Sequence, residues 1–139
     1  MALRRDQLQK LAEAKLIDGQ ILLDARRFSS AYYLGGYAIE LGLKACAAKQ
    51  VLAETIPDKA FGDKIYTHDF LTLVRLAGLA RELRAAQDAD RRFQANWGIV
   101  AEWSPNVRYE VVEAMSAQLL IQAVVEMNHG VMQWIKMHW

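Results

Sequence analysis

This sequence has no marked excess of positive or negative charge, and it has few cysteines, few prolines and no long apolar run. Its 139 residues contain one Cys and two Pro, and 17 basic side chains are balanced by 16 acidic ones, for a formal net charge of +1. That balance argues against a chain built mainly to coat nucleic acid or an anionic membrane. The longest stretches without a charged residue, Phe28 to Ile39 and Ala114 to Val125, have 12 residues each. Both are too short to span a bilayer, so we expect no membrane segment.

The single cysteine, Cys46, has no partner for an internal disulfide, and the sequence has no Cys-x-x-Cys pair for zinc or redox chemistry. Its Ala-rich surroundings are typical of a helix and predict a buried structural thiol. No three His, Asp and Glu residues show metal-ligand spacing, and no Gly-rich phosphate loop is present, so we expect neither a metal nor a cofactor. The first six residues turn charged at once and lack the apolar run of a signal peptide, which predicts a cytoplasmic protein.

Helical periodicity is what the sequence has in abundance. Its length and its 53% apolar content predict one globular domain over residues 1–139. No strand-like alternation bounded by hairpin turns is present, so we expect an all-α fold, an antiparallel up-and-down bundle of four to five helices. The expected helices cover residues 3–27, 30–54, 67–78, 90–102 and 110–137, with the main loop at 55–66. Thr67 is the expected N-cap of the third helix, and Asp88 or Asp90 that of the fourth.

The second expected helix carries a seam of small apolar residues at heptad spacing, formed by Ala31, Leu34, Ala38, Leu41, Ala45, Ala48 and Leu52. Gly35, Gly36 and Gly42 lie in the same helix. A glycine inside a helix costs about 1 kcal/mol relative to alanine, so these three predict the close approach of a neighbouring element.

The last expected helix has a narrow polar stripe and a wide apolar arc. One core contact does not need so broad an arc, which predicts a second buried surface and hence a homodimer. The four tryptophans are expected to be core or interface anchors rather than platforms for stacked bases. They are Trp97, Trp103, Trp134 and Trp139.

A polar stripe runs along a different face of the second expected helix. Tyr33, Tyr37, Glu40 and Lys44 follow one another at spacings of four, three and four residues. A Glu four residues before a Lys is the favourable order for an ion pair, worth about 0.2–0.5 kcal/mol when exposed. The stripe is either a solvated face with one salt bridge or a polar cleft lined by phenols, a carboxylate and an ammonium.

Around this stripe the sequence resembles a known family. The segment from Ala31 to Ala45, AYYLGGYAIELGLKA, is similar to the signature helix of HEPN domains, the "higher eukaryotes and prokaryotes nucleotide-binding" domains. Residues 67–71, THDFL, resemble the family's His-Asp-Leu opening of the next helix, and Arg108-Tyr109 its Arg-Tyr before the last helix. The order and the spacing of the three motifs also agree. The first and last helices agree only in length and apolar character.

The resemblance implies a helical bundle that forms a homodimer and is found beside a minimal nucleotidyltransferase in toxin–antitoxin or stress modules. Other members are metal-independent RNases, which carry an Arg followed, after four to six intervening residues, by a His. The positions where that Arg would precede a His of this chain hold Phe61, Gly62, Asp63, Gln122, Ala123, Val124, Val131, Met132 and Gln133. None is Arg, so we expect the chain not to be an enzyme on its own.

The residues expected to contact a ligand are Tyr33, Tyr37, Glu40, Lys44, His68, Asp69, Arg108 and Tyr109. In this hypothesis Lys44 and Arg108 bind the phosphate of a nucleotide or RNA, or face the active site of the partner, and Glu40 holds the basic groups.

Several alternatives stay open. His68 could instead pack on the loop and form a hydrogen bond with a backbone group. Arg108 could form a structural ion pair with Glu40. The chain could be an RNase toxin that uses His68 and Arg108 in a non-standard geometry. It could also be a dimeric adaptor without a ligand, in which the polar stripe only sets the helix register.

Overall fold

The computed structural model describes residues 3–139, and these residues contain helices and no strand. The prediction of an all-α fold is therefore confirmed. The structure has eight α-helices rather than the expected four to five, because short helices lie between the long ones. In chain order they are α1 (Arg5–Asp24), α2 (Phe28–Ala48), α3 (Lys59–Lys64), α4 (Phe70–Leu76), α5 (Ala80–Ala89), α6 (Arg91–Ala101), the 3-10 helix η1 (Pro105–Tyr109), α7 (Ala114–Val125) and α8 (Val131–Lys136).

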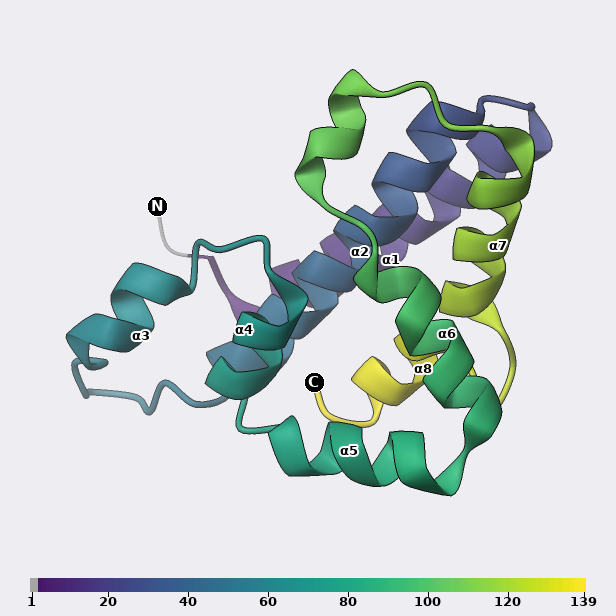
Figure 1. Cartoon of the computed structure of the whole chain (residues 1–139). Helices are drawn as coiled ribbons and strands as arrows, with labels where there is room; N and C mark the ends of the chain where they lie inside the picture. Colours follow the sequence, from purple (N-terminus) through teal and green to yellow (C-terminus); the bar gives the residue numbers. More distant parts are fainter. Residues whose placement is uncertain (1–2) are drawn as a thin grey trace.

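Helix α2 is the centre of the molecule (Figure 1). A connection of three residues, 25–27, turns the chain back on itself, so α1 and α2 pack side by side as an antiparallel pair. Helices α4, α7 and α8 and the short η1 contact other faces of α2. A helix that is apolar on nearly all sides is stable only when it is surrounded in this way.

The glycines of α2 lie where its neighbours come closest, as their positions predict. A Cβ added at Gly35 would lie 2.8 Å from Cδ1 of Ile121 in α7, and one added at Gly42 would lie 3.0 Å from Cγ2 of Ile135 in α8. At Gly36 the added atom would overlap the indole ring of Trp103. Small residues thus set the distance between α2 and the elements around it.

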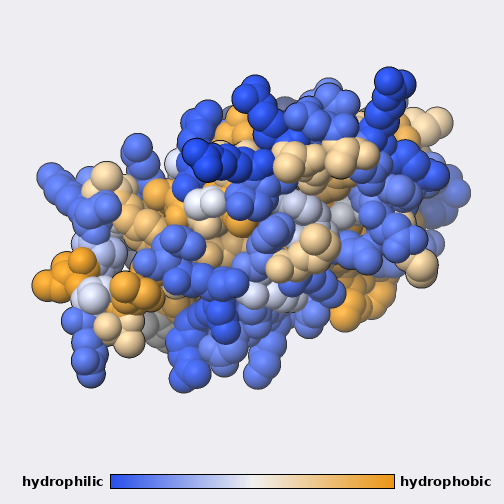
Figure 2. All heavy atoms as spheres, turned by 90° about the horizontal axis from the view of Figure 1, so that it is seen from below, coloured by the Kyte–Doolittle hydropathy of each residue, from blue (hydrophilic) through white to orange (hydrophobic). Residues whose placement is uncertain are grey.

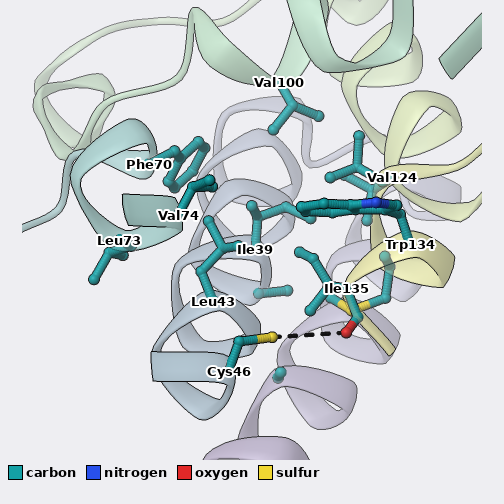
Figure 3. Packing of buried hydrophobic residues seen from close by; sticks show 14 of the residues in the cluster. Ile39, Leu43, Cys46, Phe70, Leu73, Val74, Val100, Val124, Trp134 and Ile135 are labelled. Atoms are coloured by element: carbon teal, nitrogen blue, oxygen red, sulfur yellow. Dashed lines mark hydrogen bonds between the residues drawn. The ribbon is translucent and has the colours of Figure 1, made fainter. Parts of the chain in front are cut away.

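Side chains from most of the other helices fill the core around α2, and Figure 3 shows part of it. The largest fully buried ones include Ile39, Leu43, Leu73, Leu120 and Ile135. Cys46 is 2% exposed, and its Sγ lies 3.7 Å from the carbonyl oxygen of Ile135. Burial raises the pKa of this thiol to about 12. The predicted buried thiol is therefore confirmed, and so is the burial of Trp97, Trp103 and Trp134.

Several expected helix boundaries in the first two thirds of the chain are wrong. Helix α2 stops at Ala48, because the chain turns over the next residues and reaches a φ of +64° at Glu54. The expected loop at 55–66 contains α3, whose N-cap is Asp58. Helix α4 begins after Asp69 rather than at Thr67, because the Asp69 carboxylate accepts hydrogen bonds from the backbone N–H and the hydroxyl of Thr72. Helix α5 was not expected at all.

The expected helix over 110–137 is interrupted. The chain is extended before α7, and it leaves the helix again between α7 and α8. Asn128 has a φ of +70° there, a conformation that asparagine tolerates better than most residues.

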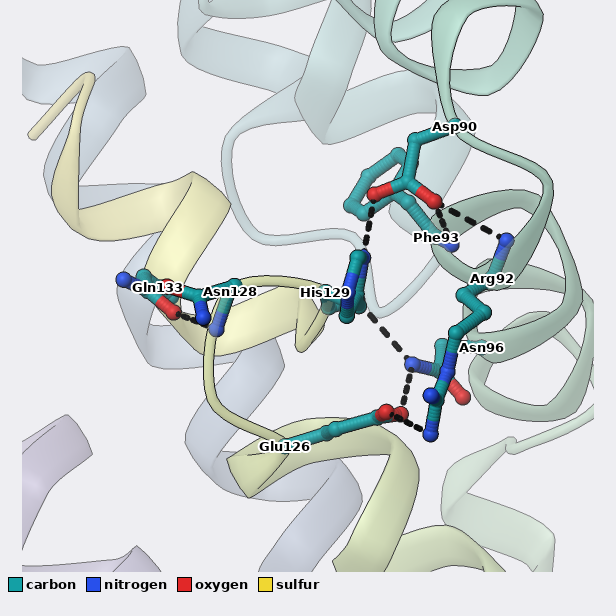
Figure 4. A network of polar contacts seen from close by, with 8 residues as sticks. All are labelled: Asp90, Arg92, Phe93, Asn96, Glu126, Asn128, His129 and Gln133. Carbon is teal, nitrogen blue, oxygen red and sulfur yellow. Dashed lines mark hydrogen bonds and ion pairs between the residues drawn. The ribbon is translucent and has the colours of Figure 1, made fainter.

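Polar contacts to α6 hold this interruption in place (Figure 4). His129 Nδ1 lies 2.6 Å from Asp90 Oδ2, and the Asn96 amide donates to Glu126 Oε2 at 2.8 Å and to the His129 carbonyl at 3.0 Å. Arg92 pairs with the other oxygen of Glu126. Asp90 also accepts from the backbone N–H groups of Arg92 and Phe93 and is the N-cap of α6, as predicted.

Much of the apolar arc of the last segment is buried within the chain itself. Leu120, Val124, Val131, Trp134 and Ile135 are all at most 6% exposed, because α7 and α8 pack against both α2 and α6. Other apolar side chains of this segment remain exposed, namely Met115, Leu119, Val125 and Met127. In residues 3–139, no helix combines the length and the apolar character needed to cross a membrane.

Candidate functional site

A buried carboxylate on α2 joins two basic side chains. The Glu40 side chain is 4% exposed; its Oε2 accepts a hydrogen bond from Lys44 Nζ at 3.2 Å, and its Oε1 lies 2.7 Å from His68 Nδ1. Lys44 is one helical turn further along α2, which gives the ion pair that the spacing predicts. His68 comes from the connection between α3 and α4. The contact therefore ties that connection to the central helix.

The carboxylate decides how the imidazole of His68 is presented. Burying a carboxylate is unfavourable unless it is paired, and here each oxygen has a partner. Because Nδ1 faces Glu40, Nδ1 is the donor, and Nε2 is left as the second functional nitrogen of the ring. The His68 side chain is 54% exposed, and no hydrogen bond joins Nε2 to any of the residues that the structure describes. Glu40 therefore fixes Nδ1, and Nε2 remains accessible to a ligand.

Three adjoining pockets lie along the segment that leads to His68. The cationic pocket, of about 620 Å³, is lined by Asp63, Lys64, Tyr66, Thr67, Thr72, Arg75 and Leu76. The histidine pocket, of about 410 Å³, is lined by residues 67–71 of that segment and by Trp97, Ala101, Trp103, Ser104 and Pro105. The apolar pocket, of about 210 Å³, is lined by Leu3, Leu8, Lys44, Ala48, Val51, Phe61, Ile65 and Tyr66. Thr67 and Tyr66 each line two of the pockets and so join all three.

The cationic pocket is lined by two basic side chains, Lys64 and Arg75, and by one acidic side chain, Asp63. Lys64 and Arg75 take part in none of the ion pairs found within residues 3–139. Asp69 lies nearby, and hydrogen bonds from the Thr72 hydroxyl and backbone N–H, together with the charge of Arg75, hold the pKa of its carboxyl below the usual value. Tyr66 is 74% exposed at the rim. These are groups that suit an anion attached to a flat ring.

The predicted tyrosines belong to an aromatic cluster beside Glu40. The rings of Tyr33 and Tyr37 are both half-buried and 6.0 Å apart, and Tyr33 is also 6.0 Å from Trp103. Trp103 is stacked on Phe70 at 5.4 Å. Burial, followed by the charge of Glu40, raises the pKa of the Tyr37 phenol. Phe70 and Trp103 of this cluster line the histidine pocket.

Two expectations about the basic residues are wrong. His68 does not bind backbone, because its ring is held by Glu40. Arg108 does not pair with Glu40, since the basic partners of that carboxylate within residues 3–139 are Lys44 and His68. The Arg108 guanidinium instead lies 5.4 Å from the ring centroid of Tyr109, which is 81% exposed near the end of η1. The structure therefore gathers Glu40, Lys44, His68 and the adjacent Asp69, and leaves the Arg108–Tyr109 pair at the surface.

The residues that line the cationic pocket are not identified in the sequence analysis. Lys64 and Tyr66 fall in the segment expected to be a plain loop. The available signal was the spacing of Asp69, Thr72 and Arg75, which at intervals of three residues share one face of a helix.

Comparison of the chain with models of protein families, with curated proteins and with solved structures finds no match. Within residues 3–139, no group of three His, Cys, Asp or Glu side chains is placed to hold a metal ion. The chemistry of the site therefore has to be argued from its own side chains.

Proposed function

We propose that this chain is a HEPN-like helical module that binds the phosphate of a nucleotide or of RNA beside His68. In this proposal it acts with a minimal nucleotidyltransferase in a toxin–antitoxin or stress module of the cytoplasm. The supporting observation is the buried Glu40 carboxylate, which holds Lys44 and presents His68 next to the cationic pocket. The motifs at residues 31–45, 67–71 and 108–109 support the family assignment.

The geometry distributes the roles differently from the sequence hypothesis. The charge of Lys44 is compensated by Glu40, and its side chain is only 13% exposed, so Lys44 supports the carboxylate rather than meeting a phosphate. His68, Lys64 and Arg75 are the groups with open hydrogen-bonding capacity on the accessible side. In this proposal they bind the phosphate, and Glu40 orients the imidazole.

Binding is tested by titrating the isotope-labelled protein with AMP, ATP and inorganic phosphate, followed by NMR. We expect shifts in residues 64–75 and a loss of affinity of about tenfold or more, which corresponds to about 1.4 kcal/mol, for His68→Ala and for Arg75→Ala. Lys59→Ala and Arg81→Ala remove exposed cations that line none of the three pockets, and they are the matched controls. Equal effects of the pocket and the control variants would mean that only general charge attraction is measured.

The homodimer belongs to the same proposal. Exposed apolar side chains on α1, Ile17 and Ile21, and on α7, Met115 and Leu119, support it, and α1 and α7 contact each other. Light scattering after size exclusion should give twice the chain mass of 15.8 kDa. The double change Ile17→Glu and Ile21→Glu should give a monomer, whereas Leu52→Glu, at an exposed leucine on another part of the surface, should not. A monomeric wild-type protein would remove this part of the proposal.

The partner is tested in the native host. A tagged copy of the chain should co-purify, at equal stoichiometry, with a protein that carries a nucleotidyltransferase active site. A tagged homodimer without such a companion would contradict the two-component proposal and favour an adaptor. If no nucleotide or phosphate shifts the melting temperature either, the adaptor without a ligand is the better description.

One observation favours a second candidate, a metal-independent RNase. A carboxylate that holds one nitrogen of a half-exposed histidine is an arrangement suited to general base catalysis. His68 Nε2 would accept the proton of a ribose 2′-hydroxyl as its oxygen attacks the adjacent phosphorus. The P–O5′ bond would break, leaving a 2′,3′-cyclic phosphate, and the departing 5′-oxygen would take a proton from water. Cleavage of RNA by the purified chain, lost in His68→Ala and retained in His138→Ala, would establish it. An inactive wild-type protein would exclude it.

A further inference from the structure

Among the residues that line the apolar pocket, two carry a polar side-chain group, the ammonium of Lys44 and the phenol hydroxyl of Tyr66. The lining residues come from α1 and the residues before it, from the end of α2 and the residues after it, and from α3 and the residues that follow it. On the face shown in Figure 2, hydrophobic side chains gather at the end of the molecule that carries α3, among hydrophilic ones. Val51, Leu52 and Ile56 are exposed in the connection between α2 and α3.

Lys44 is mostly buried but only partly satisfied. An ammonium has three N–H donors, and within residues 3–139 one hydrogen bond to another side chain engages them, the bond to Glu40. A buried donor without an acceptor is unfavourable. A ligand in the pocket that brings a hydrogen-bond acceptor to Lys44 would remove that penalty.

The charge around Lys44 selects the kind of acceptor. Glu40 already compensates the ammonium, so a second carboxylate or a phosphate would put two anions on one cation in an apolar setting. A neutral acceptor, such as a ring nitrogen or a carbonyl oxygen, adds no charge. The walls supply aromatic rings from Phe61 and Tyr66, and these favour a flat ring. The volume of about 210 Å³ is below the roughly 300 Å³ at which pockets for drug-sized ligands begin, so it suits one ring system.

We infer that the apolar pocket binds a planar heterocycle whose ring nitrogen or carbonyl oxygen accepts a hydrogen bond from Lys44. This inference rests on the proposed function, because the ring is then the base of the nucleotide whose phosphate lies in the cationic pocket. Tyr66 lines both pockets, and Lys44 and His68 bind the two oxygens of the same carboxylate. A ligand therefore has a short continuous path from the ring site to the phosphate site.

The test separates the ring from the phosphate. The probes are the four ribonucleosides, which have no phosphate, their monophosphates, and inorganic phosphate. Ala48→Leu fills the pocket from α2 with a good helix former, and Ala85→Leu makes the same change at an exposed position of α5. We expect Ala48→Leu to weaken nucleosides and monophosphates at least tenfold and to change inorganic phosphate by less than twofold. Ala85→Leu should change none of them.

The two proposals fail in different ways. If wild-type protein binds phosphate and monophosphates but no nucleoside, or if Ala48→Leu binds nucleosides unchanged, the ring site is wrong and the phosphate site stands. If nucleosides bind, but His68→Ala and Arg75→Ala leave the affinities for inorganic phosphate and monophosphates unchanged, the phosphate site is wrong and the ring site stands. Should Ala48→Leu fail to fold, nuclear Overhauser contacts between a nucleoside ring and Phe61 in the wild-type protein decide. Their absence at saturation overturns the inference.

Discussion

The indole ring of Trp103 lies directly on the backbone of Gly36, in the middle of α2. An added Cβ at Gly36 would overlap the ring atoms Cδ1, Nε1 and Cδ2. The indole N–H is buried and has no hydrogen-bond partner among the residues that the structure describes. Phe70, the first residue of α4, stacks on the same ring. One tryptophan thus connects the central helix with the wall of the histidine pocket and with the start of α4.

The variant Gly36→Ala should therefore destabilise the protein. Alanine raises helix propensity by about 1 kcal/mol, but overpacking a well-filled contact costs about 1–3 kcal/mol. We expect a net loss in the free energy of unfolding, measured by urea denaturation. Gly98→Ala is the matched control, because Gly98 lies inside α6 with no atom within 4 Å of an added Cβ. It should be as stable as wild type or more stable by up to about 1 kcal/mol.

This contrast shows which parts of the fold could be predicted from the sequence. The glycines of α2 predict close approach because glycine in a helix needs a reason, and the Glu40–Lys44 pair follows from spacing within one helix. Both are local signals. The glycines do not reveal that the neighbour at Gly36 is a tryptophan from a loop, since that depends on how the chain after α6 returns to α2.

Three of the errors involve contacts between distant segments. His68 reaches Glu40 across 28 positions of sequence, through a connection whose course is set by α3. The residues 110–137 look continuous because they are apolar and contain no proline, yet His129 and Glu126 bind α6 and interrupt the helix. Arg108 lies at the surface on η1, with its guanidinium over the ring of Tyr109, while the partners of Glu40 are Lys44 and His68. Periodicity carries no information about such pairings.

Removing the Glu40 carboxylate should be costly. Glu40→Ala leaves the mostly buried Lys44 ammonium without its partner, and breaking a buried pair in this way costs about 3–5 kcal/mol. Lys44→Met should cost less, because Glu40 keeps His68. The double variant should be more stable than the sum of the two single losses predicts, in a double-mutant cycle measured by urea denaturation. Additive losses would mean that the two side chains do not interact.

The thiol of Cys46 should be unreactive until the protein unfolds. Its side chain is 2% exposed, and burial raises its pKa to about 12, so little thiolate forms at pH 8. We expect slow reaction with iodoacetamide in buffer and rapid reaction in denaturant. In the variant Ala85→Cys the added thiol is on the surface of α5 and serves as an internal standard. Two thiols labelled at the same rate in buffer would contradict the burial.

The Asp90–His129 contact should make stability depend on pH in the acid range. Hydrogen bonding to His129 is the main cause that holds the pKa of the Asp90 carboxyl below its usual value, with the N–H groups of Phe93 and Arg92 contributing. The folded protein thus binds this proton less readily than the unfolded chain. The stabilisation is therefore complete at pH values above about 4, and it is lost as the pH falls through the lowered pKa. Asp90→Asn keeps a side-chain oxygen for the cap but does not titrate. The difference in unfolding free energy between wild type and Asp90→Asn should be largest near pH 5 and shrink towards pH 2. The loss of stability that other groups cause at low pH is common to both proteins and cancels in this difference. A difference that stays constant over this range would show that Asp90 is not paired with His129 in solution.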